Sequence, residues 1–306
     1  MTLAVAIVTW NAVLVAADRK LSGNPRLKGF DATKLIRIQT TDSHGVMSYA
    51  GVGANLYTKP FEVSTWLERV LRGYVRSHSD TMQEIAKAAT EQGIATRLKD
   101  ENGRPQFHDF MFAGFLDGAP IIDHITSQNL GPAIEEMKKA APNHFAILRT
   151  WVPPKKYQVF AIGSGSRSLS IDRTVRRVGK YLKRSGHYSA NRRRASALLS
   201  MIVRAISEKH IDVSRECICC WTSNSIGGEF WIYDADGRLV QDGQMVPSVA
   251  HGVDSTEMMN RLRPVFDALK TEWMRALDAG LPVPTLDEEA VRAAVAKVDL
   301  TPKKKF

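Results

Sequence analysis

The chain is poor in cysteine and in metal-binding patterns, and both shortages exclude classes of protein. Its 306 residues include three cysteines, Cys217, Cys219 and Cys220, which all lie in one apolar run. An odd, clustered set is not a disulfide framework, and no second Cys or His pair stands at zinc-ligand spacing. We therefore expect buried strand cysteines in a reducing compartment and no bound metal.

Long apolar segments and nucleotide loops are also missing. No stretch reaches the roughly 20 apolar residues of a membrane-spanning helix. The apolar N-terminal segment is broken by Thr9, Trp10 and Asn11 and lacks a basic leader, so it does not resemble a secretory signal. No Gly-rich phosphate loop is present. These absences predict a cytoplasmic protein that has no membrane contact and no cofactor.

Positive charge, by contrast, is abundant. The formal net charge is +10, and basic surfaces attract phosphate whatever fold carries them. The basic residues Arg173, Arg176, Arg177 and Lys180, however, occupy the polar side of one expected helix, with few aromatic neighbours and no RNA- or DNA-binding motif. We interpret them as solvated helix faces or subunit contacts, which disfavours nucleic acid as a partner.

Hydrophobic periodicity predicts strands, helices, strands, helices and strands in that order. Strand-like runs cover 3–10, 12–17, 34–39, 45–50, about 110–126 and about 145–163, and amphipathic helices cover 63–74 and about 80–98, 170–184 and 192–208. CICCWTS and GEFWIYD read as a closing hairpin. This order is that of an α+β fold, a four-layer αββα sandwich in which helices cover the outside of two facing sheets.

The C-terminal part follows a different pattern. We expect residues 2–240 to form the main domain, with an insertion at about 128–156, and residues 241–306 to form a helical extension with a basic tail. An apolar stripe that includes Leu262, Phe266 and Trp273 predicts a helix that packs either against its own domain or against a neighbouring subunit.

The second residue suggests a specific chemistry. Removal of Met1 would leave Thr2 with a hydroxyl beside a free α-amine. An α-amine with an ordinary pKa of about 7.7 to 8.0 can accept the hydroxyl proton near neutral pH. Because many chains carry threonine here without using it, the hypothesis depends on the residues that follow.

The chain opens with TLAVAIVTWNAVLVAADRK, which contains the step Ala17-Asp18. Four further motifs follow in order: SGNPRLKGFDATKLIRI, VMSYAGVGAN, FMFAGFLDGAPIIDHI and VFAIGSGS. In order and spacing these segments resemble the β-type subunits of the proteasome family, including the bacterial peptidase HslV, whose first hairpin starts on the catalytic threonine. The resemblance covers roughly residues 2–237 and implies an N-terminal-nucleophile (Ntn) hydrolase fold.

The resemblance also implies roles for individual residues. Thr2 would be the nucleophile, Lys34 the catalytic lysine, Asp18 the carboxylate that orients it, Gly51 the N–H donor to the oxyanion, and Ser164 the serine that positions the amine. The implied substrate-binding residues are Leu21, Ser22, Ala32, Ile36, Tyr49 and Gly53.

The resemblance has one departure. The family's acid-x-x-Ser-Gly-Gly turn corresponds here to Thr222–Gly228, which has no acid, so Ser223 and Ser225 are the nearest substitutes beside the amine.

These patterns predict a threonine-type endopeptidase that cleaves peptides or unfolded proteins inside a homo-oligomeric ring or double ring. A separate ATPase or unfoldase would deliver folded substrates. Three alternatives stay open: a catalytically silent ring subunit, an Ntn amidase that acts on a small molecule, and a basic nucleic-acid-binding module.

Overall fold

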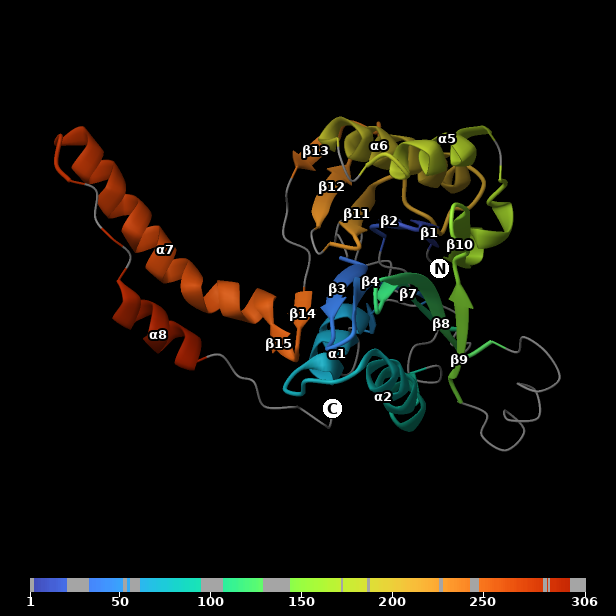
Figure 1. Cartoon of the computed structure of the whole chain (residues 1–306), viewed down its shortest axis with the longest axis horizontal. Helices are drawn as coiled ribbons and strands as arrows, with labels where there is room; N and C mark the ends of the chain where they lie inside the picture. Colours follow the sequence, from blue (N-terminus) through green and yellow to red (C-terminus); the bar gives the residue numbers. More distant parts are fainter. Residues whose placement is uncertain are drawn as a thin grey trace.

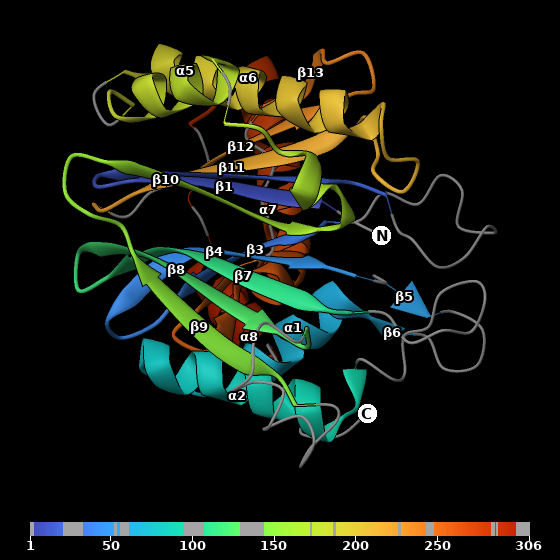
Figure 2. The same cartoon turned by 90° about the vertical axis from the view of Figure 1, so that its right-hand side faces the viewer.

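The computed structural model describes residues 3–20, 33–51, 54–55, 61–94, 107–128, 144–171, 173–185, 188–225, 228–242, 248–282, 285 and 287–297. Within them, two large sheets lie face to face (Figure 2). A core of side chains fills the space between the sheets and includes Val15, Val46, Met111 and Ile218.

The first sheet has six antiparallel strands in the order β10-β1-β2-β11-β12-β13. Their bounds are β1 Leu3–Thr9, β2 Ala12–Asp18, β10 Tyr157–Gly163, β11 Cys217–Ser223, β12 Glu229–Tyr233 and β13 Leu239–Asp242. Every residue of β1, β2 and β11 is buried, as expected for central strands covered on both faces. The three cysteines are free and buried in β11.

The second sheet has seven strands in the order β15-β14-β3-β4-β7-β8-β9. Their bounds are β3 Leu35–Gln39, β4 Ser43–Ala50, β7 Asp109–Leu116, β8 Ala119–Thr126, β9 Ala146–Trp151, β14 Ser248–Ala250 and β15 Val253–Asp254. This sheet is mixed, because β14 runs parallel to β3 while the other described pairs are antiparallel. β5 (Ala54–Asn55) and β6 (Phe61–Glu62) form a separate pair.

Helices pack on the outer faces of both sheets. α1 (Val63–Leu71) and α2 (His78–Glu91) cover the seven-stranded sheet, and Trp66, Leu67 and Ile85 fill the core beneath them. α5 (Arg173–Leu182) and α6 (Ser189–Ser207) cover the six-stranded sheet through Val178 and Leu199. The short 3₁₀ helix η2 spans Ser164–Ser168. No helix in the described part of the chain is long and apolar enough to cross a membrane.

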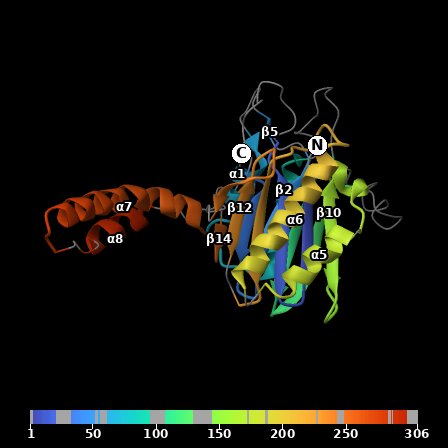
Figure 3. The same cartoon turned by 90° about the horizontal axis from the view of Figure 1, so that it is seen from above.

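The expected four-layer αββα sandwich with a purely helical C-terminal extension is a wrong description of this chain. The structure consists of two large sheets, one antiparallel and one mixed, with six α-helices among the described residues. Two of these, α7 (Ser255–Asp278) and α8 (Glu288–Ala296), lie outside the layers and project sideways (Figures 1 and 3). Strands β14 and β15, which lie within the expected helical extension, complete the seven-stranded sheet. They could not be predicted, because strands of two or three residues are too short to show a hydrophobic periodicity.

Candidate functional site

A buried ion pair joins the two sheets. Lys34 directly precedes β3 of the seven-stranded sheet, and Asp18 is the last residue of β2 in the six-stranded sheet. Lys34 Nζ lies 3.1 Å from Asp18 Oδ1, and both side chains are fully buried. The structure therefore brings together two of the residues that the sequence proposes for catalysis.

Backbone amides from three segments hold the Asp18 carboxylate. The Leu3 N–H donates to Oδ1 at 2.9 Å, and the N–H groups of Lys20 and Ser214 donate to Oδ2 at 3.1 and 3.2 Å. Hydrogen bonds to an ionised acceptor are roughly twice as strong as neutral ones. The carboxylate thus fixes the start of β1 relative to Lys34.

Burial changes the acidity of Lys34. Desolvation lowers the pKa of the ammonium group, and the nearby Asp18 charge offsets only part of this effect. A buried lysine with a lowered pKa gives up its proton more easily than a surface lysine, which is why buried lysines recur in acid–base chemistry. The site therefore combines a fixed carboxylate with an amine that can exchange a proton.

Gly51 directly follows β4, the strand that pairs with β3 in the seven-stranded sheet. Leu35 faces Ser48, so continuing the register places Lys34 opposite Tyr49, with Gly51 two residues further. Gly51 has φ +131°, and a Cβ there would approach His108 Nδ1 to 2.6 Å and the Phe107 carbonyl to 2.9 Å. Both the conformation and the close contacts require glycine.

Ser164 is the first residue of η2. It directly follows Gly163, which has φ +96° and pairs with Leu3 at the start of β1. Further along η2, Ser168 Oγ lies 2.5 Å from His210 Nε2, which ties η2 to the loop before β11. The backbone of η2 and the loop that carries Ser214 thus both adjoin the start of β1.

The proposed substrate-binding residues are described only in part. Ile36 and Tyr49 share the core between the seven-stranded sheet and α1, and burial raises the pKa of the Tyr49 hydroxyl. Thr2, Leu21, Ser22, Ala32 and Gly53 lie outside the described residues.

The turn that contains Ser223 and Ser225, which the sequence predicts to lie beside the α-amine, lies elsewhere. Asp18 faces Cys217 at the start of β11, whereas Ser223 faces Ala12 at its other end, so the placement of Ser223 and Ser225 near the amine is wrong. Ser214, which sequence reasoning missed, occupies the Asp18 end instead. Its one sequence signal is its place in the short loop that leads into β11.

A second buried cluster was also missed. His78 Nε2 lies 2.7 Å from Asp123 Oδ2, and Ser43 Oγ lies 2.9 Å from His78 Nδ1. Arg149 donates to both Asp123 oxygens at 2.8 Å. Although the residue types are those of a hydrolase triad, His78 and Asp123 are fully buried and Ser43 also hydrogen-bonds Thr40. This cluster joins α2 to β4, β8 and β9.

The described residues offer no cation site. They contain no group of three or more His, Cys, Asp or Glu side chains placed to hold a metal ion. Asp18 and Lys34 are themselves groups that can transfer a proton and stabilise charge.

Among known proteins, similarity to this chain was found in solved structures. No family model and no curated protein matches the chain. Anbu from Hyphomicrobium sp. strain MC1, a Gly-1 mutant, is 14% identical, with 88% of this chain and 100% of that chain covered and a TM-score of 0.41. Anbu from Yersinia bercovieri, described as an ancestral beta-subunit, is 12% identical, with 94% and 100% covered and the same TM-score.

These findings correct the resemblance drawn from the sequence. The similar structures named above are Anbu proteins, which are not HslV, so the assignment to the HslV-like branch is wrong. At this identity and TM-score the similarity does not carry residue roles to this chain. Motifs such as VFAIGSGS are short strand–turn patterns, which unrelated β-rich proteins can share.

Proposed function

We propose that the chain is a threonine-type hydrolase that cleaves peptide bonds, with Thr2 as N-terminal nucleophile after removal of Met1. One observation carries the proposal: the Leu3 N–H and Lys34 Nζ both contact Asp18 Oδ1, at 2.9 and 3.1 Å. The carboxylate that contacts the lysine therefore also holds Leu3, the residue that directly follows the proposed nucleophile in the sequence.

The chemistry follows the ordinary course of acyl transfer. The Thr2 hydroxyl oxygen attacks the substrate carbonyl carbon, and the α-amine accepts the hydroxyl proton. The amine then protonates the leaving nitrogen as the peptide bond breaks, which leaves an ester on Thr2. Water, deprotonated by the same amine, hydrolyses the ester and regenerates the hydroxyl.

The surrounding groups would favour this course. Lys34, with its lowered pKa, would hold or release a proton during the attack, and the adjacent charge of Asp18 keeps Lys34 oriented. The Gly51 N–H would face the developing oxyanion, a donor whose loss typically costs about 10² to 10³ in rate. Peptides or unfolded proteins are the proposed substrates. Enclosure in a homo-oligomer and delivery by a separate ATPase are further parts of this proposal.

The test is intact-protein mass spectrometry before and after incubation with an epoxyketone or β-lactone that reacts with N-terminal threonine. We expect loss of Met1 and one adduct, together with hydrolysis of a fluorogenic peptide. Thr2→Ala should remove both signals, whereas Thr271→Ala, at an exposed position on α7, should leave them unchanged.

Three other outcomes would each contradict a part of the proposal. Retained Met1 without an adduct would overturn the proposal in favour of a silent subunit. An adduct with turnover of a small amide but of no peptide would keep the nucleophile and replace the substrate class. Peptide hydrolysis that survives Thr2→Ala would exclude Thr2 as the nucleophile.

A further inference from the structure

β9 is an edge strand of the seven-stranded sheet, and its register shows which backbone groups point outward. The Val152 N–H donates to the Pro120 carbonyl across the β8–β9 pair. In an antiparallel pair the groups that face the neighbouring strand alternate along the chain. The N–H and C=O groups of Ile147, Arg149 and Trp151 therefore point away from β8.

Common protections of an open edge are missing here. Among the described residues, no group pairs with the outward N–H and C=O groups of β9. Natural edge strands are usually blunted by charge, proline or a bulge, yet the single charged side chain of β9, Arg149, is directed to Asp123. Trp151 is 52% exposed and Leu148 is 39% exposed. Such an edge fits the addition of another strand.

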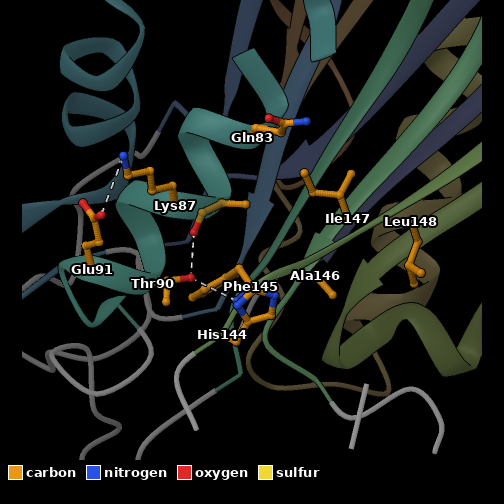
Figure 4. Close-up of a pocket in the computed structure, with 10 residues that line it drawn as sticks. Gln83, Lys87, Thr90, Glu91, His144, Phe145, Ala146, Ile147 and Leu148 are labelled. Carbon is orange, nitrogen blue, oxygen red and sulfur yellow. Dashed lines mark hydrogen bonds and ion pairs between the residues drawn. The ribbon is translucent and has the colours of Figure 1, made fainter. Parts of the chain in front are cut away.

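A pocket of about 550 Å³ opens between α2 and the beginning of this edge (Figure 4). Ala86, Phe145 and Ile147 give it apolar walls, and Gln83, Lys87 and Glu91 on α2 line its other side. The Phe145 N–H, which would otherwise be the first outward group, donates to Thr90 Oγ1 at 3.1 Å. Pockets of this size take large apolar groups.

The residues of β9 whose backbone groups point away from β8 carry side chains on the α2 side of the sheet. Asp123 bonds both Arg149 and His78 of α2, and Ile147 packs against the core beneath α1 and α2. Because side chains alternate along a strand, Ile147, Arg149 and Trp151 share that face. An exposed tryptophan and an apolar pocket thus lie on the same side of one short strand.

A two-fold axis through Arg149 makes this edge complementary to itself. In an antiparallel β9–β9 pair centred there, Ile147 faces the partner's Trp151, so each Trp151 lies over the other copy's pocket. The two Arg149 side chains meet at the axis, but each is neutralised by two 2.8 Å bonds to its own Asp123. Centring the pair on Ile147 would instead use the Phe145 N–H, which Thr90 already holds.

We propose that β9 pairs with β9 of a second copy, joining two seven-stranded sheets into one, with Trp151 of each copy in the α2–β9 pocket of the other. This interface lies at the opposite edge of the sheet from β15, where α7 begins (Figure 1). The proposal is independent of the proposed hydrolase chemistry.

The test is the mass of the full-length protein in solution, measured by light scattering and sedimentation at several concentrations. We expect a dimer or a larger even-numbered assembly. Trp151→Glu should weaken the dimer by about 30-fold or more, the effect of losing a buried aromatic anchor. The matched control is Trp10→Glu, because Trp10 is 55% exposed and lies in the turn between β1 and β2. It should behave as wild type.

A cross-link tests the register. The Leu148→Cys/Thr150→Cys variant keeps Trp151. In the same register Leu148 of one copy faces Thr150 of the other, so the new cysteines of the two strands lie opposite each other. Mild oxidation should produce covalent dimers, and Trp10→Cys should not. Circular dichroism establishes that each variant is folded. A monomeric wild type, an assembly unchanged by Trp151→Glu, or the absence of the cross-link would overturn the proposal.

Discussion

Two buried carboxylates, Asp18 and Asp123, each have a cationic partner, yet their surroundings give them different properties. Asp18 is bonded by Lys34 and by three backbone amides. Asp123 is bonded by His78 and by both arms of Arg149. At the first centre burial dominates and lowers the pKa of Lys34. At the second, burial alone would raise the pKa of Asp123, but hydrogen bonds from His78 and Arg149 outweigh it and lower the pKa.

The difference distinguishes the arrangement that we propose to be reactive from one that is structural. Fixed backbone donors can hold Asp18 in place whatever the protonation state of Lys34, so the lysine proton remains available. At Asp123 the donors are side chains from α2 and β9, and their loss would separate those elements. The following variants test this distinction, from the largest expected effect to the smallest.

Asp123→Ala should have the largest effect on stability. It would leave His78 buried and Arg149 partly buried without their carboxylate, and breaking such a buried pair costs about 3–5 kcal/mol. Urea denaturation followed by circular dichroism measures the loss. Glu91→Ala, at a largely exposed ion pair, should change the unfolding free energy by less than about 0.5 kcal/mol. Equal losses in the two variants would contradict the structural role of Asp123.

Lys34→Met should mainly affect activity. Methionine fills much of the same volume, and Asp18 keeps its three backbone donors, so we expect a loss of about 1–3 kcal/mol in stability. Peptide hydrolysis should fall by about 10² to 10⁴, as for removal of a group that handles protons. Kinetics on the fluorogenic peptide measure this fall, and Lys87→Met, on the exposed face of α2, is the control. Retained activity in Lys34→Met would make the pair structural.

Glu68 provides the smallest and most specific test. Burial, followed by the charges of Asp254 and Glu62, raises its pKa to about 7. A raised carboxyl pKa means that the folded state binds the proton more tightly, so stability falls as pH rises from the ordinary value near 4.5 through about 7.

Glu68→Gln should remove this decrease. Urea midpoints of both proteins, measured below and above that pH window, test the prediction, with Glu91→Gln as control. If the wild-type midpoint fell no more than that of Glu68→Gln across the window, the raised pKa would be refuted. The centre at Asp123 should respond in the opposite direction. Because the pKa of Asp123 is lowered, the stability that its ionised form contributes is present above pH 3.8, the ordinary pKa, and is lost as the pH falls below that value.

Much of the element order was predictable, because the core leaves local patterns. The strand-like apolar runs at 3–10 and 12–17 correspond to β1 and β2, and the apolar spacing that begins at Val63 corresponds to α1. The predicted ends of helices and strands were less accurate than their order. The helix expected at about 80–98 spans His78–Glu91, because its start is set by the Ser77 cap, whose side chain accepts the Asp80 N–H.

Long-range contacts were not predictable from local patterns. Nothing local indicates that Ser214 meets Asp18 across 196 positions, or that β14 joins β3 in parallel. The misplaced Ser223 turn shows the same limit, because a motif's similarity does not determine which end of a strand it occupies.

The sequence by itself determined most of the longer strands and helices and the candidate reactive residues Thr2, Asp18 and Lys34, because hydrophobic periodicity and short motifs are local properties of the chain. The tertiary structure decided that Lys34 reaches from one sheet to Asp18 on the other and that Asp123 binds both His78 and Arg149. It also decided that β9 is an edge strand in the described part of the sheet. Those outcomes depend on sheet order and strand register, which hydrogen bonds between distant segments establish only when the chain folds.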